Sequence, residues 1–248
     1  MSRITTPSAM QGKVALITGA SSGLGKAVAL QFAQAGVKVI LNARRTDRLQ
    51  ELVTQIQQAG GEAIAVAGDA SRMETAESAV QKGIAQFGQI DFLINNAGLG
   101  NYKTLDATSV EEYDEMMNAN MRSSFVFAKA VAPGMKQRRS GSMVFVSSVA
   151  GLRGTGNEAV YSASKAAQIA FAQGLDDELR PHGIQVTSVC PGGIKTEFAL
   201  GKGRTQEGVD ASEMMDAADV AEAVIFACTQ PASLRILQLT IRPMNEAK

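Results

Sequence analysis

Residues 18–25 have the sequence TGASSGLG; they follow a short apolar run at 14–17 and precede residues 26–35, which have helical spacing. Gly19 permits a tight turn, Gly23 lets a phosphate group approach the backbone, and Gly25 lets a helix pack closely on a strand. The first turn of a helix also offers unpaired N–H groups and a partial positive charge to an anion. The segment therefore predicts a strand, a phosphate-binding turn and a helix. We expect ligand phosphates to lie against the residues of the turn, which are Gly19, Ser21, Ser22, Gly23, Leu24 and Gly25.

The composition is that of an ordinary soluble globule. Of 248 residues, 45% are apolar and 19% are charged, and the formal net charge is zero. This length suits one large α/β domain spanning residues 1–248, with residues 1–11 as a flexible N-terminus. Basic residues are not concentrated on any segment, so we expect no nucleic-acid partner.

The N-terminus is polar and lacks the apolar core of a signal peptide, and no apolar run approaches the ~20 residues that span a bilayer. We therefore expect a cytoplasmic protein with no membrane contact. Cys190 and Cys228 lie in apolar stretches, which favours buried free thiols over a disulfide. With one histidine and no Cys-x-x-Cys, no segment has metal-ligand spacing, and we expect no metal.

Short β-branched runs alternate with longer helical patterns along the chain. Strands are predicted at 14–17, 37–41, 63–66, 90–94, 143–146, 184–189 and 236–241, and helices at 26–35, 47–59, 73–87, 110–135, 160–179 and 219–227. Continuously apolar strands separated by helices predict an α/β fold: a doubly wound, Rossmann-like parallel sheet of seven strands with helices on both faces. Residues 199–212 lack periodicity, and we expect about 196–216 to form a substrate loop, as a disordered segment or a mobile lid.

Further motifs appear in a fixed order after the glycine-rich turn. Asn-Asn-Ala-Gly occupies 95–98, Asn-Ala-Asn-Met 118–121, Val-Ser-Ser-Val-Ala-Gly 146–151, and Tyr-Ser-Ala-Ser-Lys 161–165. Over residues 12–228 the chain resembles the short-chain dehydrogenase/reductase family, in its single-domain branch with members like 3-oxoacyl-ACP reductase. One departure is the C-terminal Leu-Thr-Ile-Arg-Pro-Met at 239–244, where many members have an Asp-Gly-Gly turn.

The resemblance implies a set of site residues. The implied catalytic residues are Asn120, Ser148, Tyr161 and Lys165. By the same resemblance, Asn120 helps to hold a relay water, and Lys165 also binds the nicotinamide ribose. The additional implied cofactor residues are Asp69 and Ala70 near the adenine, Asn96, Ala97 and Gly98 beneath the cofactor, and Pro191, Gly192, Ile194 and Thr196 near the nicotinamide, together with Tyr161 and Lys165 themselves.

Tyr161 and Lys165 are four residues apart and share one helix face. A phenol has an ordinary pKa of ~10, and a neighbouring ammonium stabilises its phenolate. Tyr161 is then suited to give a proton to a carbonyl oxygen and to take it back in reverse, while Ser148 holds that oxygen. These residues predict an oxidoreductase that interconverts a carbonyl and an alcohol.

The end of the second predicted strand, Leu-Asn-Ala-Arg-Arg at 41–45, indicates the cofactor. An NAD site usually has Asp or Glu there to bind the ribose 2′-hydroxyl, whereas this chain has Ala43 followed by Arg44. Arg44 is suited to pair with a 2′-phosphate, and Arg45 to add positive field or to stack on adenine. The sequence therefore favours NADP(H) over NAD(H), with Arg48 as a solvated charge at the start of the next helix.

The substrate and the assembly are less constrained. Phe198 and residues 199–215 are expected to form one pocket wall, with Met214 and Met215 in the pocket or the core, and Arg153, Asn157 and their loop opposite. Asn101, Tyr102 and Lys103 either touch the substrate or, as the preferred interpretation, are exposed loop residues. A β-ketoacyl thioester, a sugar, a steroid-like ketone and a small aldehyde remain open as the small-molecule substrate. The resemblance implies a homo-oligomer, dimer or tetramer, through the helices beginning at Val110 and Val160.

Two other functions remain open: a non-catalytic NADP(H)-sensing binding protein, and a lyase or isomerase that uses the same tyrosine. Loss of Tyr161 or Lys165 would have favoured the sensing protein, and the sequence retains both.

Overall fold

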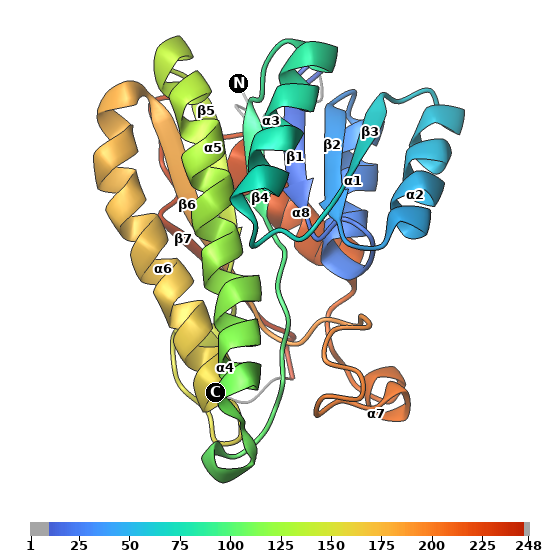
Figure 1. The fold of residues 1–248 in the computed structure, drawn as a ribbon, viewed down its shortest axis with the longest axis vertical. Helices are drawn as coiled ribbons and strands as arrows, with labels where there is room; N and C mark the ends of the chain where they lie inside the picture. The colour runs from blue at the N-terminus through green and yellow to red at the C-terminus, as the bar shows by residue number, and fades with distance from the viewer. Residues whose placement is uncertain (1–9, 246–248) are drawn as a thin grey trace.

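The computed structural model of the protein describes residues 10–245, and within them seven strands form one parallel sheet (Figure 1). Their order across the sheet is β3-β2-β1-β4-β5-β6-β7, which confirms the predicted doubly wound fold. The strands are β1 (Val14–Thr18), β2 (Lys38–Ala43), β3 (Ala63–Ala67), β4 (Phe92–Asn95), β5 (Gly141–Val146), β6 (Ile184–Pro191) and β7 (Gln238–Ile241).

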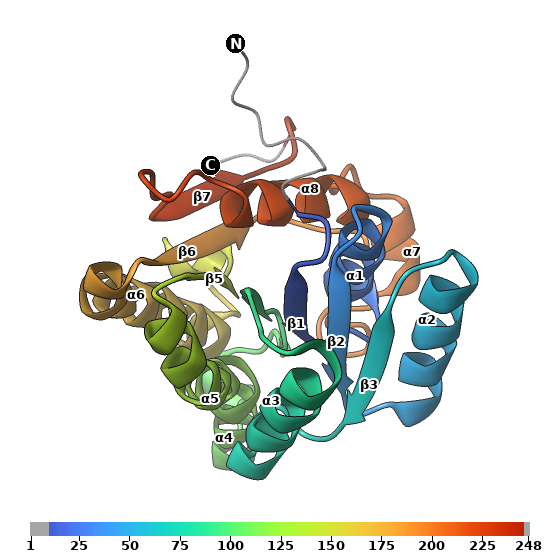
Figure 2. The same cartoon turned by 90° about the horizontal axis from the view of Figure 1, so that it is seen from above.

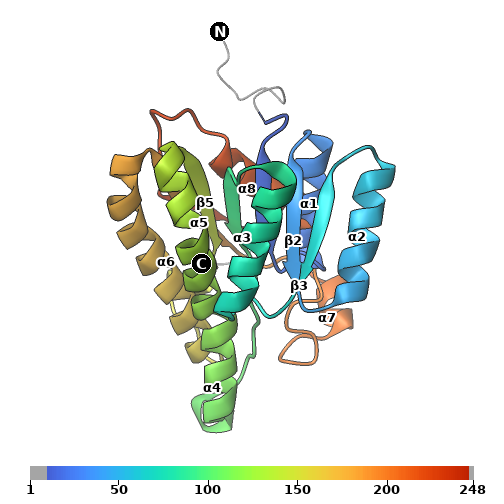
Figure 3. The ribbon, with the colours of Figure 1, turned by 45° about the horizontal axis from the view of Figure 1, so that its top comes forward.

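Helices cover both faces of the sheet (Figures 2 and 3). One face carries α1 (Gly23–Gln34), α2 (Thr46–Gln58) and α8 (Ala217–Cys228), and the other carries α3 (Met73–Phe87), α5 (Ser123–Arg138) and α6 (Ala159–Leu179). Figure 1 shows α4 (Val110–Met117) and α7 (Gln206–Asp210) beyond the same end of the sheet. Short 3₁₀ turns occupy Leu105–Ala107, Val149–Gly151 and Arg180–His182.

The two hydrophobic cores follow from the two-residue period of a strand. In β1, Ala15 and Ile17 pack with α1, α2 and α8, whereas Val14 and Leu16 pack with α3, α5 and α6. All five residues of β1 are buried. A strand buried on both faces has no polar alternation, which is why the apolar runs of the sequence predicted these strands well.

The prediction of one uninterrupted helix over 110–135 is wrong. α4 ends at Met117, a π-helical turn follows at Asn118–Arg122, and α5 then continues to Arg138. Side chains from two neighbouring residues and from α6 donate to the Asn120 carbonyl, which has left the regular helical ladder. The wider turn places Asn120 inside the protein with no exposed surface.

The expected flexible N-terminus lies mostly outside the described residues, which begin at Met10. Met10 itself is buried in the core, so that residue does not fit the expectation. Cys190 and Cys228 are free and buried, as predicted.

The glycine-rich turn brings β1 and α1 unusually close. A Cβ on Gly25 would lie 2.4 Å from the carbonyl oxygen of Gly19 and 2.5 Å from the amide nitrogen of Asn96. The first neighbour is backbone and cannot rotate away. Gly25 is therefore required for the contact between helix and turn, as the spacing predicted.

We predict that Gly25→Ala destabilises the protein by about 1–3 kcal/mol, because overpacking forces the turn apart. At about 2–4 °C per kcal/mol for a chain of this size, calorimetry should record a fall in Tm of about 5 °C. Gly174→Ala is the matched control, since Gly174 is helical and a Cβ there meets nothing within 4 Å. That variant should keep or raise the Tm. Equal Tm values for the two variants would contradict the packing argument.

Candidate active site

One cavity of about 1550 Å³ lies where the carboxyl ends of the strands meet the loops. It is larger than the few hundred Å³ of an ordinary small-molecule site and has room for a dinucleotide with a substrate. The predicted site residues lining it are Gly19, Ser21, Ser22, Gly23, Leu24, Arg44, Arg45, Asp69, Ala70, Asn96, Ala97, Gly98, Ser148, Tyr161, Lys165, Pro191, Gly192, Ile194 and Thr196. Gly25 and Asn120 lie behind the wall.

The phosphate turn is bonded to the end of β4 through Thr18. Its hydroxyl accepts from the N–H groups of Asn96 and Ala97 at 3.0 and 2.9 Å. The Asn96 amide donates in return to the carbonyl oxygens of Thr18 and Gly19, at 3.0 and 3.3 Å. The Asn-Asn-Ala-Gly motif thus fixes the floor of the cavity beside the turn.

The start of α1 suits an anion. Ser22 is the N-cap residue, and its side chain makes no capping hydrogen bond to the helix. The first N–H groups of α1 therefore lack a side-chain partner of the usual kind and face the cavity beside Gly23. The turn consequently fits the phosphates of a dinucleotide.

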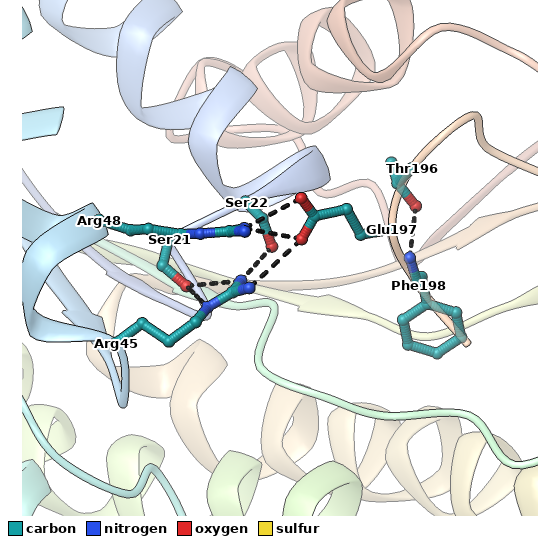
Figure 4. A network of polar contacts seen from close by, with 7 residues as sticks. All are labelled: Ser21, Ser22, Arg45, Arg48, Thr196, Glu197 and Phe198. Carbon is teal, nitrogen blue, oxygen red and sulfur yellow. Dashed lines mark hydrogen bonds and ion pairs between the residues drawn. The ribbon is translucent and has the colours of Figure 1, made fainter. Parts of the chain in front are cut away.

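Arg45 lies across the phosphate turn (Figure 4). Its guanidinium donates to the hydroxyls of Ser21, at 3.1 and 3.3 Å, and of Ser22, at 2.7 Å. It also pairs with Glu197 at 3.3 Å, and Arg48 pairs with the same carboxylate at 2.7 Å. Arg48 is exposed, as expected for a solvated charge, and it also pairs with the substrate loop through Glu197.

Arg44 and Asp69 both line the cavity, and their charges interact. Arg44 is exposed, and Ala70 follows Asp69 in the wall. Burial raises the pKa of Asp69, but hydrogen bonds from Ser71 and the charges of Arg44 and Arg72 outweigh it and leave the pKa lowered. The carboxylate therefore stays ionised, with a cationic side chain near it.

Tyr161 is 7% exposed, at the junction of the cofactor and substrate parts of the cavity. Burial is the largest influence on its hydroxyl and raises the pKa, while hydrogen bonding with Ser148 opposes the rise. The expectation that Lys165 lowers the pKa of Tyr161 does not hold in this structure. The Lys165 ammonium lies 5.8 Å from the centre of the tyrosine ring and bonds elsewhere, so desolvation prevails.

Lys165 is 3% exposed and has two fixed partners. Its ammonium donates to the Val146 carbonyl and to the Gln168 side-chain oxygen, both at 2.9 Å. Burial lowers the pKa of Lys165 to about 8. Gln168 in turn donates to the Asn120 carbonyl at 3.0 Å, so it links Lys165 to the π-helical turn. Gln168 was not predicted, although its position three residues after Lys165 was a signal for a shared helix face.

Asn120 is bonded on every side. Its side chain accepts from the Leu99 N–H at 2.8 Å and donates to the Leu99 carbonyl at 3.0 Å and the Ser164 hydroxyl at 2.8 Å. Its own carbonyl accepts from Ser124 and Gln168. Asn120 thereby ties the loop after β4 to α6, and its role with a relay water stays a prediction.

Aromatic residues surround Tyr161 on the substrate side. Tyr102 meets it edge to face, with ring centres 5.6 Å apart, and Phe198 lies at 5.9 Å. Leu99 packs against the same group. Tyr102 is therefore part of the pocket wall, and Asn101 is 6% exposed, so the expectation of an exposed loop is wrong for both and holds for Lys103. The fit of Tyr102 against Tyr161 had no short-range signal in the sequence.

Other expected wall residues divide between cavity and core. Met214 and Arg153 line the cavity, whereas Met215 packs against the core beside β6 and α8. Asn157 is not among the lining residues. Within the described part of residues 196–216, the loop contains the short helix α7 rather than a wholly irregular segment.

Residues 10–245 contain neither a metal-binding cluster nor a membrane-spanning helix. No cluster of three or more His, Cys, Asp or Glu side chains there has the arrangement of a metal site. Over the same residues, every helix is too short or too polar to cross a bilayer.

A family model for short chain dehydrogenases matches residues 13–207. The chain therefore belongs to the short-chain dehydrogenase/reductase family and is an oxidoreductase of that family, which binds nicotinamide cofactors. An uncharacterised oxidoreductase of Staphylococcus saprophyticus is 38% identical over 238 residues, which cover 95% of this chain and 99% of that protein.

Solved structures agree with this assignment. The closed form of a serine dehydrogenase complexed with NADP⁺ has a TM-score of 0.89 and 30% identity, covering 95% of this chain and 96% of that one. An alcohol dehydrogenase from the archaeon Thermococcus sibiricus, complexed with 5-hydroxy-NADP, has a TM-score of 0.85 and 30% identity. The match covers 95% of this chain and 98% of that one. The resemblance drawn from the motifs is confirmed.

We predict that Glu197→Gln strengthens NADPH binding. The Glu197 carboxylate pairs with Arg45, so it competes with a cofactor phosphate for the same guanidinium. Exposed ion pairs of this kind are worth up to about 1 kcal/mol, or roughly fivefold in Kd. Fluorescence titration should show NADPH tightening by roughly two- to fivefold and NADH tightening less.

Glu115→Gln is the matched control, because Glu115 also lines the cavity but pairs with Lys202 rather than Arg45. Its NADPH affinity should stay within about twofold of the parent. Weaker NADPH binding by Glu197→Gln would contradict competition and indicate that Glu197 holds the loop over the cofactor.

Proposed function

We propose that this protein is an NADP(H)-dependent oxidoreductase that interconverts a carbonyl and an alcohol, with Tyr161 as acid and base. The observation that carries the proposal is the position of Tyr161. Tyr161 lines the same cavity as the phosphate turn, its hydroxyl interacts with Ser148, and the buried Lys165 ammonium lies 5.8 Å from the centre of its ring. Hydride chemistry at a carbonyl needs a proton donor at this point between cofactor and substrate.

Tyr161, Ser148 and Lys165 have separate roles in the proposed reaction. NADPH supplies the hydride when it is bound. Burial keeps the Tyr161 phenol protonated, so it is poised to donate to a carbonyl oxygen in the direction of reduction. Ser148 holds that oxygen by a hydrogen bond. Lys165 is fixed by Val146 and Gln168, and its ammonium lies 5.8 Å from the centre of the tyrosine ring.

NADP(H) is favoured over NAD(H) by the charges at the end of β2. The strand ends in Ala43 rather than in Asp or Glu, and Arg44 and Arg45 both line the cavity beside the phosphate turn. A second anionic phosphate gains from these two guanidinium groups, whereas a ribose hydroxyl does not. The two structural relatives described above were solved with NADP⁺ or a modified NADP.

The remaining assignments concern the protein's surroundings. A single domain is supported by the one sheet that incorporates strands from residue 14 to residue 241. A dimer or tetramer is supported by exposed apolar side chains on α4 and α5, among them Tyr113 and Phe125, each 44% exposed. The free cysteines suit a reducing compartment such as the cytoplasm. A 3-oxoacyl thioester remains one candidate substrate of the general carbonyl class.

We predict that Tyr161→Phe leaves the Kd for NADPH within about twofold but lowers kcat by on the order of 10² or more, because the proton donor is lost. Tyr113→Phe, which removes a hydroxyl on exposed α4, is the control and should keep the parent rate. The measurement is the loss of NADPH absorbance across a panel of carbonyl compounds. A Tyr161→Phe enzyme with near-normal kcat would refute the role of Tyr161.

A further inference from the structure

An arginine on the substrate loop lies one aromatic ring away from Tyr161. The Arg204 guanidinium is 5.7 Å from the centre of the Tyr102 ring and 6.0 Å from that of Phe198. Both rings contact Tyr161. Arg204 also lines the cavity and donates a long hydrogen bond, 3.4 Å, to the Ile194 carbonyl.

The backbone of the loop holds Arg204 in this position. The Ala199 carbonyl accepts from the N–H groups of Lys202 and Arg204 at 3.0 and 3.1 Å, and the Arg204 carbonyl accepts from Gly201 at 2.9 Å. Ala199 has φ = 61°, in the left-handed region that a residue with a Cβ rarely adopts. Such strain is found mainly where surrounding structure and function require it.

This turn is docked onto the loop that follows β4. The Tyr102 N–H donates to the Lys202 carbonyl at 2.9 Å. A Cβ on Gly203 would lie 2.5 Å from that of Tyr102, so the two backbones approach closely. The contact places the Arg204 side chain over the aromatic group rather than in solvent.

Arg204 forms no ion pair with a carboxylate among the described residues. Among residues 10–245, no carboxylate oxygen lies within 4 Å of its guanidinium. Glu158 is the acidic group whose charge interacts with it; burial raises the pKa of Glu158, and Arg204 acts against that rise. The guanidinium lies at cation–π distance from both rings and also acts on the Tyr102 hydroxyl. Its remaining donors suit a planar anion.

We propose that Arg204 binds the carboxylate of the substrate, and that the substrates are short oxo acids and the corresponding hydroxy acids. The inference rests on the proposed function, since it concerns the same cavity. The single guanidinium of Arg204 matches the single negative charge of a carboxylate. The negative charge of Glu158 near Arg204 disfavours a dianionic phosphate by repulsion. The carbonyl carbon gains hydride from NADPH, its oxygen gains the Tyr161 proton, and a hydroxy acid and NADP⁺ result.

The test measures the activity of the holoenzyme on matched pairs of substrates. Acetoacetate, 2-oxobutyrate and 4-oxopentanoate are each assayed beside their methyl esters, and dihydroxyacetone phosphate beside dihydroxyacetone. At least one acid should exceed its ester in kcat/KM by about tenfold or more. Arg204→Gln should lower kcat/KM for that acid by on the order of 10², mostly through KM, because a charge-assisted bidentate contact is lost.

The ester rate and the Kd for NADPH should change by less than about threefold in Arg204→Gln, which shows that the loop remains folded. Lys202→Gln is the matched control: it removes a cation two residues away that pairs with Glu115. It should leave the preference for the acid unchanged. Arg204→Lys should restore part of the acid's KM.

Equal rates for acids and esters, or a preference for the phosphate, would overturn the assignment of a carboxylate. If the enzyme reduces none of the compounds, the proposed function fails first, and calorimetry of acetoacetate binding to the protein–NADP⁺ complex then tests Arg204 alone. Binding that Arg204→Gln abolishes supports the carboxylate site, and no binding by the parent protein contradicts it.

Discussion

The hydroxyl of Thr18 joins the two halves of the cavity, because it bonds the phosphate turn to the end of β4. Two N–H groups, from Asn96 and Ala97, converge on that oxygen, and Asn96 bonds back to the turn. Gly25 permits this approach because it carries no Cβ. The position of a dinucleotide's phosphates is thereby tied to the loop whose next residues, Gly98 and Leu99, face Lys165 and Asn120.

Burial then sets the protonation state of the proposed catalytic residues. Tyr161 and Lys165 are both nearly inaccessible, and desolvation moves their pKa values in opposite directions, up for the phenol and down for the ammonium. Each shift favours the neutral form, as expected in a medium that solvates charge poorly. A protonated phenol suits reduction, and the reverse reaction must remove that proton against the same desolvation.

Features with a local signal could be predicted from the sequence. The strands were visible because their apolar runs are continuous, and the phosphate turn because its glycines have a fixed spacing between strand and helix. The π-helical turn could not be predicted in this way. The residues of Asn118–Arg122 carry no signal for it, and the turn depends on a hydrogen bond from Gln168 on α6.

Contacts between distant segments left no such signal. Glu197 meets Arg45 across 152 positions of sequence, and Tyr102 meets Tyr161 across 59. The prediction that Arg44 and Arg45 belong to the cofactor site was available from their place after β2. Both side chains are exposed, but the hydrogen bonds of Arg45 to the turn and its ion pair with Glu197 depend on the folded loop.

The central claim is that hydride passes from NADPH to a carbonyl carbon in this cavity. The most direct measurement follows deuterium from NADPH labelled at C4, in two samples that carry the label on opposite faces of the ring. We expect mass spectrometry to find one deuterium on the carbinol carbon of the alcohol from one sample and none from the other. Alcohol without deuterium from both samples, or no alcohol with NADPH bound and unchanged, would contradict the claim.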